Sequence, residues 1–288
     1  MIKKIFGLLT AIIFAAQAYA SVSIAPTKVE INANKARNNY LTTAIDIKGD
    51  AQKPTRLRVS AGYFVINSNG EADLIDEYTG DPHDISKKIK FIPSEFNILP
   101  KKSQKLRVNI IGLNQLPDGE SRAILYIEDV DSKEYDIPSG KAGFGAQLII
   151  KTRVGVPLYV DKGNFTRIGE IESVDVTRNR RNLLRTEMKV KSTGNSRLKY
   201  TAKAQIIKDK KLISEYNMNE HTVGESNSYL ARDLIDISKV EEAGDYTLRI
   251  ILTYKDEKGK KKNLTHEVPF TIEEEDIIKD TNTNEEVL

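Results

Sequence analysis

Apolar and polar residues alternate with a period of two along most of this chain, and such alternation predicts β-strands that bury one face. Helical periodicity is rare by comparison, and the alternating segments are short and bounded by Pro, Gly, Asn and Asp. The expected strands cover residues 40–47, 56–61, 63–66, 91–93, 106–110, 122–127, 168–176, 184–190, 198–207, 246–254 and 264–272. Many short strands without intervening helices predict an all-β chain built from β-sandwiches.

Turn residues separate these segments at several places. Asn67-Ser68-Asn69-Gly70 predicts a hairpin-like turn, and Gly194-Asn195 and Lys258-Gly259-Lys260 predict two more. Tyr246 opens an alternating run directly after an Ala-Gly-Asp segment. It fits the tyrosine corner of an immunoglobulin-like strand, and an ordinary buried strand tyrosine is the alternative reading.

The first twenty residues read as an export signal and not as part of the fold. Lys3 and Lys4 precede an apolar run from Ile5 to Ala16, and Ala18-Tyr19-Ala20 has the small-x-small form of a cleavage site. The run is shorter than the span of about 20 residues that a bilayer requires. We expect a soluble mature chain that starts near Ser21 and does not insert into the membrane; an uncleaved N-terminal anchor is the alternative.

The chain length of 288 residues predicts two domains of ordinary size. The apolar pattern is interrupted at Asp161-Lys162-Gly163-Asn164, and acidic and amide residues dominate from Glu273 onwards. We therefore expect a signal peptide at residues 1–20, an N-terminal domain at residues 21–160, a C-terminal β-sandwich domain at residues 161–275 and an acidic disordered tail at residues 276–288.

Composition narrows the possible functions. The chain has no Cys, so thiolate metal sites, thiol nucleophiles and disulfides are excluded. His83, His221 and His266 are far apart and form no metal-binding motif, and no phosphate loop or serine elbow is present. Without Lys3 and Lys4 the mature chain has 42 basic and 41 acidic residues, a net charge of +1 that does not favour nucleic acid. We expect no enzyme activity, no metal and no cofactor.

Three segments carry a recognisable combination of motifs. They are Val22–Val29 at the start of the mature chain, the region from Pro93-Ser94-Glu95-Phe96 through Lys105–Val108 to Leu116–Ser121, and Ala146–Val154. In this order and spacing they resemble the N-terminal domain of the PapD-like periplasmic chaperones that assemble pili in the chaperone-usher pathway. The resemblance extends over residues 21–160.

The resemblance implies two immunoglobulin-like β-sandwich domains in a boomerang arrangement, located in the periplasm. It also implies pilus (fimbrial) subunits and an outer-membrane usher as partners. Subunits of this pathway lack the last strand of their own sandwich, and the chaperone lends its seventh strand to fill the groove, a mechanism called donor-strand complementation.

The expected donor strand ends at Thr152-Arg153. Alternation then places Phe144, Ala146, Leu148 and Ile150 on one face of that strand, in one apolar row. The alternation has a second reading, because a half-buried strand that faces its own core shows the same pattern.

The resemblance also implies two basic residues that hold the carboxylate at the C-terminus of the subunit. Lys28 matches the first, although many relatives carry Arg there. At the second position this chain has Gly155, and Arg153, two residues earlier on the same face, is the candidate substitute. Lys28 and Arg153 are therefore the expected carboxylate-binding residues.

Glu120 matches the acidic member of an ion pair that is structural in relatives. The arginine expected as its partner is absent from residues 158–160, which read Leu-Tyr-Val. On this reading Glu120 has no partner and is exposed.

Two rival functions remain open from the sequence. An exported adhesin or polysaccharide-binding β-sandwich protein would bind sugar through exposed aromatic rings, but the chain has no Trp and few aromatics. A secreted hydrolase would need a catalytic pair, and nothing in the sequence selects one among its many carboxylates.

Overall fold

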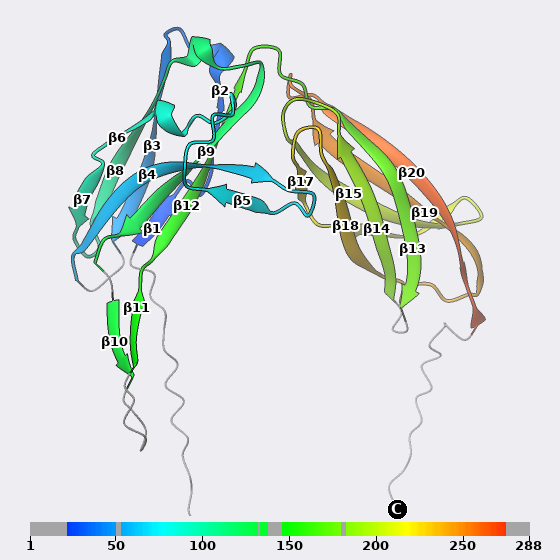
Figure 1. Cartoon of the computed structure of the whole chain (residues 1–288). Coiled ribbons are helices and arrows are strands. Elements are labelled where there is room, and N and C mark those ends of the chain that lie inside the picture. Colours follow the sequence, from blue (N-terminus) through cyan, green and yellow to red (C-terminus); the bar gives the residue numbers. More distant parts are fainter. Residues whose placement is uncertain (1–21, 50–52, 132, 138–145, 180–182, 275–288) are drawn as a thin grey trace, which may run out of the picture.

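The protein consists of two β-sandwich lobes. Our computed structural model describes residues 22–49, 53–131, 133–137, 146–179 and 183–274. The lobes are joined at one end and diverge towards the other, so that the chain has the outline of a boomerang (Figure 1). The predicted fold class, all-β with two immunoglobulin-like domains, is confirmed.

The first lobe packs two sheets against each other. One sheet has the order β1-β3-β8-β6, and the other has the order β2-β12-β9-β4-β5, with β7 added beside β4. The strands are β1 (Val22–Ala25), β2 (Val29–Asn32), β3 (Tyr40–Gly49), β4 (Thr55–Ile66), β5 (Ala72–Ile75), β6 (Ile89–Ile92), β7 (Glu95–Ile98), β8 (Ser103–Ile111), β9 (Gly119–Asp129) and β12 (Arg153–Lys162). The 3₁₀ turns are η1 (Ala33–Lys35), η2 (Ser86–Lys88) and η3 (Leu113–Gln115).

A separate hairpin extends from the first lobe. It consists of β10 (Lys133–Ile137) and β11 (Ala146–Ile150), which pair antiparallel and continue the line of β9 and β12 beyond the sandwich (Figure 1). The hairpin therefore lies at the free end of the lobe, away from the junction with the second lobe.

Alternation explains the core of the first lobe. In β4 every second residue from Thr55 to Val59 is buried while the residues between them are exposed, because one strand face meets the opposite sheet. The largest contributors come from β3, β8, β9 and β12, and they close the sandwich without a disulfide: Ile45, Ile47, Leu106, Val108, Ile110, Leu125, Ile127, Leu158 and Val160.

The second lobe repeats the sandwich with different sequence. Its sheets have the orders β13-β14-β18 and β16-β15-β19-β20, with β17 beside β15. The strands are β13 (Gly169–Asn179), β14 (Leu183–Ser192), β15 (Leu198–Lys208), β16 (Lys211–Asn217), β17 (His221–Val223), β18 (Ser228–Asp236), β19 (Gly244–Lys255) and β20 (Lys261–Ile272). Its core draws on Met188, Val190, Ala204, Ile206, Leu248, Ile250 and Leu252.

Most predicted strands are present within a few residues. The segments 56–61 and 63–66 prove to be one strand, β4, and the turn at residues 67–70 connects it to β5. Several strands were not predicted: the short strands β5, β7 and β17, which have only three or four residues, and also β10, β16 and β18. The export signal and the acidic tail lie outside the described residues. β12 ends at Lys162 and β13 begins at Gly169, and the predicted domain boundary at residue 160 stays a prediction.

Tyr246 makes the contact expected of a tyrosine corner. Its hydroxyl donates a hydrogen bond of 2.6 Å to the carbonyl of Glu242, four residues upstream, while its ring is buried in the second core. We predict that Tyr246→Phe lowers the free energy of unfolding by about 1 kcal/mol, since a buried hydrogen bond is lost with little change in packing. Urea unfolding followed by circular dichroism would measure this, with the exposed Tyr40 changed to Phe as the control. An equal loss in both variants would contradict the assignment.

Candidate functional site

The strand β9 is buried on both of its faces. An ordinary strand of a two-sheet sandwich has one face towards the core and the other towards solvent. Ala123, Leu125 and Ile127 belong to the core of the first lobe. On the opposite face, Ile124 and Tyr126 pack with Phe64, and Glu120 and Arg122 are also fully buried. The second lobe covers this end of β9, so the outer face of the sheet is the floor of the junction between the lobes.

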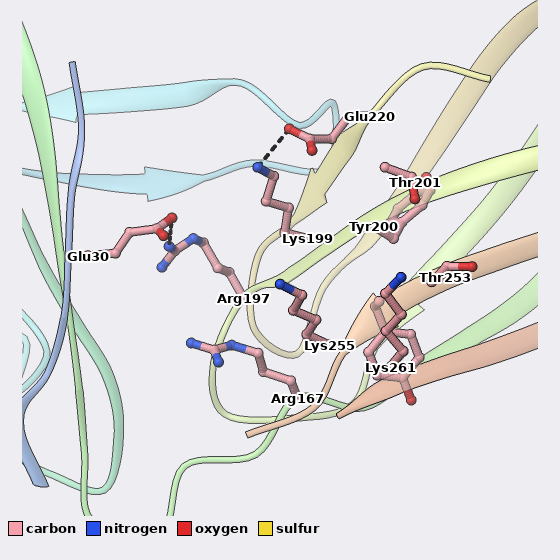
Figure 2. Close-up of a pocket in the computed structure, with 11 residues that line it drawn as sticks. Glu30, Arg167, Arg197, Lys199, Tyr200, Thr201, Glu220, Thr253, Lys255 and Lys261 are labelled. Carbon is pink, nitrogen blue, oxygen red and sulfur yellow. Dashed lines mark hydrogen bonds and ion pairs between the residues drawn. The ribbon is translucent and has the colours of Figure 1, made fainter. Parts of the chain in front are cut away.

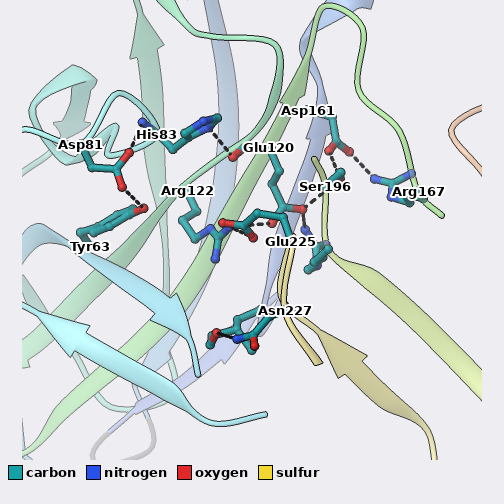
Figure 3. Close-up of polar contacts among 12 residues, drawn as sticks. Tyr63, Asp81, His83, Glu120, Arg122, Asp161, Arg167, Ser196, Glu225 and Asn227 are labelled. Atoms are coloured by element: carbon teal, nitrogen blue, oxygen red, sulfur yellow. Dashed lines mark hydrogen bonds and ion pairs between the residues drawn. The ribbon is translucent and has the colours of Figure 1, made fainter. Parts of the chain in front are cut away.

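Glu120 is the centre of that junction (Figure 3). Its carboxylate accepts hydrogen bonds from the Arg197 guanidinium and, at 3.4 Å, from the Ser196 hydroxyl, both in the second lobe. Its backbone N–H donates to the carbonyl of Asn195 at 3.0 Å. The expectation that Glu120 is exposed is therefore wrong: the residue is 0% exposed.

The missing arginine is thus supplied by the other domain. The Arg197 guanidinium stacks over the Tyr159 ring of β12, with 3.3 Å between the guanidinium carbon and the ring centroid. Burial raises the pKa of the Glu120 carboxyl, although Arg197 and Arg122 act to lower it. A carboxyl in this position depends on both cations to offset its desolvation.

A glycine makes this approach possible. Gly119 has a φ of 109°, which favours glycine, and a Cβ placed there would lie 2.6 Å from the Asn195 carbonyl oxygen. Any other residue would push the two lobes apart at the position where the Glu120 N–H donates across the junction.

A second set of contacts joins the lobes beside the first. Arg122 is 1% exposed and pairs with Glu225 of the second lobe (Figure 3). The carbonyl of Ile66, at the end of β4, accepts a hydrogen bond of 3.1 Å from the Asn227 side chain. With contacts at two separate places, the junction resists rotation of one lobe against the other.

Lys28 lies next to this network. Its ammonium is 3.3 Å from the Glu30 carboxylate, which also accepts a 2.7 Å hydrogen bond from Arg197 across the gap (Figure 2). Burial opposes ionisation of Glu30, but the two cations outweigh it and the pKa of this carboxyl is lowered. About half of the Lys28 side chain remains exposed.

Arg153 lies on the same sheet but has its own partner. Its guanidinium forms a two-fold hydrogen-bonded ion pair with Asp76, which follows β5, and stacks on the Tyr126 ring at 3.7 Å from the ring centroid. Hydrogen bonds from Tyr126 and Arg153 lower the pKa of the Asp76 carboxyl.

Gly155 offers no space for the second basic residue of the family. A Cβ there would lie 2.9 Å from the terminal methyl group of Ile124. A long side chain at this position would have to displace Ile124.

The structure does not bring Lys28 and Arg153 together. β2 and β12 are parallel, and their register pairs Val29 with Leu158, so Lys28 lies level with Pro157. Four positions along β12 separate this point from Arg153, about 13 Å at the rise of a parallel strand. The two residues pair with different carboxylates, and their joint role in binding a third carboxylate stays a prediction.

The expected donor strand coincides with β11. Its register places Leu148 opposite Tyr135 and Ala146 opposite Ile137 of β10. Phe144 lies outside the described residues. In the part of the chain that the structure describes, no strand pairs with the other edge of β11, or with the same edge of β12 before Leu158. An unpaired edge thus runs from Ala146 to Pro157, with Lys151 and Thr152 between the two strands.

Sequence reasoning missed Arg197, Ser196, Arg122 and Glu225. These residues lie in unrelated segments, and a charged residue after a turn carries no sign that it will be buried. The only available signal was Glu120 without a partner, which points to a cation elsewhere in the chain.

Metal chemistry finds no support among the described residues, where no group of three or more His, Asp and Glu could hold a metal ion. The Nδ1–H of His83 donates a 2.9 Å hydrogen bond to the Glu120 carbonyl, and His221 lies 3.8 Å from Asp233 in the second lobe. Within the same described ranges, no helix has the length and hydropathy needed to cross a membrane.

No protein-family model and no curated protein sequence matches the chain. Among solved structures, the chain is similar to the class 5 fimbriae chaperone CfaA (TM-score 0.47, 13% identity, covering 85% of this chain and 98% of that one). It is also similar to a chaperone in the CsuC–CsuE chaperone-tip adhesion subunit complex of Acinetobacter baumannii (0.43, 16%, 85% and 98%) and to the CupB2 chaperone of Pseudomonas aeruginosa (0.42, 13%, 85% and 98%).

Arg197 should matter more for stability than any exposed ion pair. Removing it in Arg197→Ala leaves Glu120 buried beside fewer cations, and we predict a loss of about 3–5 kcal/mol in the free energy of unfolding. Arg185→Ala, which breaks the exposed pair of Arg185 with Glu187, should lose about 1 kcal/mol or less. Urea unfolding of both variants compares them. Adding Glu120→Gln to Arg197→Ala should restore part of the loss, and no restoration would argue against a buried charge as the cause.

Proposed function

We propose that this chain is a periplasmic chaperone that binds pilus (fimbrial) subunits by donor-strand complementation and delivers them to an outer-membrane usher. The observation that carries the proposal is the unpaired edge from Ala146 to Pro157. An exposed edge of this length presents backbone N–H and C=O groups to any partner with a missing strand.

The sequence of that edge suits a partner with an apolar groove. Positions 144, 146, 148 and 150 alternate along the strand and are Phe, Ala, Leu and Ile. Burying the three larger side chains at about 1.5–3 kcal/mol each gives an upper limit of about 5–9 kcal/mol. One charge-assisted hydrogen bond contributes about 1.5–3 kcal/mol. The apolar row should therefore supply most of the affinity.

The register of the bound strand needs a separate determinant, because a slip by two residues preserves the apolar face. A carboxylate at the end of the subunit can provide it by pairing with a fixed cation on the chaperone. Lys28 is available for this role because half of its side chain is exposed. Arg153 would have to exchange Asp76 for the incoming carboxylate.

The rigid junction between the lobes supports the same role. The edge strand and Lys28 both lie on the first lobe, and the junction holds the second lobe in a fixed position beside them. The Glu120–Arg197 and Arg122–Glu225 contacts fix the second lobe against the sheet that contains β12. Delivery to an usher and location in the periplasm follow from the export signal and from the family resemblance.

The apolar row is tested by Leu148→Asp. We predict that this variant loses at least about tenfold in affinity for a fimbrial subunit, because a charge cannot enter an apolar groove without a partner. Gln147→Asp adds the same charge at the alternate position and should bind within about twofold of the wild type. Co-expression with the fimbrial subunits encoded in the same genome, followed by affinity purification, measures both. Equal losses would contradict donation by this face.

The cation is tested by Lys28→Glu. We predict loss of the subunit complex with no change in the fold, because the charge that faces the carboxylate is reversed. Lys35→Glu makes the same change on the exposed turn η1 and serves as the control. Purification of Lys28→Glu with its subunit at wild-type yield would refute the role.

A further inference from the structure

Two lysines face each other on neighbouring strands without a carboxylate to separate them. The register of β19 and β20 pairs Lys255 with Lys261 at the end of the hairpin. Neither ammonium has an ion-pair partner among the described residues. Like charges directly opposite in an antiparallel pair destabilise the sheet. The pair of Lys255 and Lys261 is therefore locally unfavourable for folding. Locally unfavourable features of this kind concentrate at functional sites.

The same lobe shows how a structural lysine pair is compensated. Lys208 and Lys211 are also cross-strand partners, at the β15–β16 turn. There, however, the Lys208 ammonium is 2.7 Å from Glu242 and also donates to the carbonyl of Ala243. Within the described ranges neither Lys255 nor Lys261 forms an ion pair of this kind, so their charge is available to an external anion.

These two lysines line a pocket of about 440 Å³ that opens towards the first lobe. Arg167, Arg197 and Lys199 also line it, and with Lys255 they extend from the second lobe towards Glu30 (Figure 2). Three of these cations are already neutralised: Arg197 by Glu30 and Glu120, Arg167 by Asp161, and Lys199 by Glu220 at 2.8 Å. The excess positive charge therefore belongs to Lys255 and Lys261.

We propose that this pocket binds the carboxylates of an acidic peptide segment between Lys255 and Lys261. Its volume is that of a small-ligand site and admits a few side chains. Tyr200, Tyr254, Thr201 and Thr253 line the rest of the pocket, and they offer ring surface and hydroxyl groups to a peptide. Glu30 and Glu220, which also line the pocket, disfavour a dense polyanion such as nucleic acid.

Two sources can supply such a segment. One is a partner protein that enters the gap between the lobes. The other is this chain, whose residues 275–288 contain five carboxylates and one lysine.

The chain's own segment is long enough. β20 runs eleven residue steps from Lys261 to Ile272, about 37 Å. The thirteen steps from Ile272 to Glu285 span up to about 43–47 Å when extended. Glu285 and Glu286 can therefore return to the Lys261 end, and the covalent link raises their effective concentration at the pocket.

The experiment uses a fluorescent synthetic peptide of residues 275–288. It is titrated by anisotropy into the full chain carrying Glu275→Gln, Asp276→Asn, Asp280→Asn, Glu285→Gln and Glu286→Gln, so that the chain's own carboxylates do not compete. We expect saturable binding that weakens as NaCl is raised. In the same background, Lys255→Ala with Lys261→Ala should weaken it at least about tenfold.

Matched controls separate the site from net charge. Lys210→Ala with Lys211→Ala removes the same charge at the other hairpin and should leave binding within about twofold. A peptide with its carboxylates changed to amides should not bind. Binding that survives the Lys255 and Lys261 changes, or that does not need the peptide's carboxylates, would overturn the proposal, as would the absence of binding.

The unmodified chain identifies the source. If it binds the added peptide more weakly than the chain with amides in the tail, its own segment occupies the pocket. If both bind equally, the site is open and a partner supplies the acidic segment. The peptide titrations involve no fimbrial subunit. They can therefore fail while the subunit-binding experiments succeed, and the reverse, so the two proposals are tested separately.

Discussion

The arrangement of the two lobes depends on one buried carboxylate. Glu120 is held by Arg197 from the opposite domain and lies near Arg122, and it has no access to water. A buried carboxylate without cations would be strongly unfavourable, whereas a paired one fixes the geometry of the groups around it. Because its partner comes from the second lobe, the cost of burying Glu120 is offset only when the lobes are docked. Folding of the junction and orientation of the lobes are therefore coupled.

The surfaces proposed to bind partners lie on either side of this junction. The edge of β11 and β12 extends away from it, and the cations Lys28, Lys255 and Lys261 surround it. Arg197 itself is unavailable to a ligand, since Glu120 and Glu30 take its hydrogen bonds and Tyr159 covers its face. The junction thus uses the cation with the best geometry for carboxylates as structure, and the cations proposed to bind ligands are lysines. Lysines exchange partners more readily because they lack the planar fork of arginine.

The alternation of apolar and polar residues predicted most of the fold but little of the candidate site. Period-two alternation located strands such as β4, β15 and β19, since burial of one strand face is a local property. It failed for β16 and β18, where Leu212 and Leu234 are exposed, and for β17, which has only three residues. The resemblance to pilus chaperones indicated Lys28, Arg153 and Glu120. The partners of these residues come from segments that the tertiary fold brings together, and no spacing in the sequence encodes that Arg197 meets Glu120.

Gly155 and Tyr159 of β12 are best understood together. Without a long side chain at 155, Ile124 packs over the strand, and Tyr126 beside it provides a ring for Arg153. With an aromatic ring at 159, the guanidinium that Glu120 requires can arrive from the second lobe and stack. Neither position carries a cation, and the charge comes instead from Lys28, between β1 and β2, and from Arg197 and the pocket lysines of the second lobe. The positive charge of the cleft therefore depends on docking of the lobes, so a ligand that binds these cations also favours the docked state over a separated one.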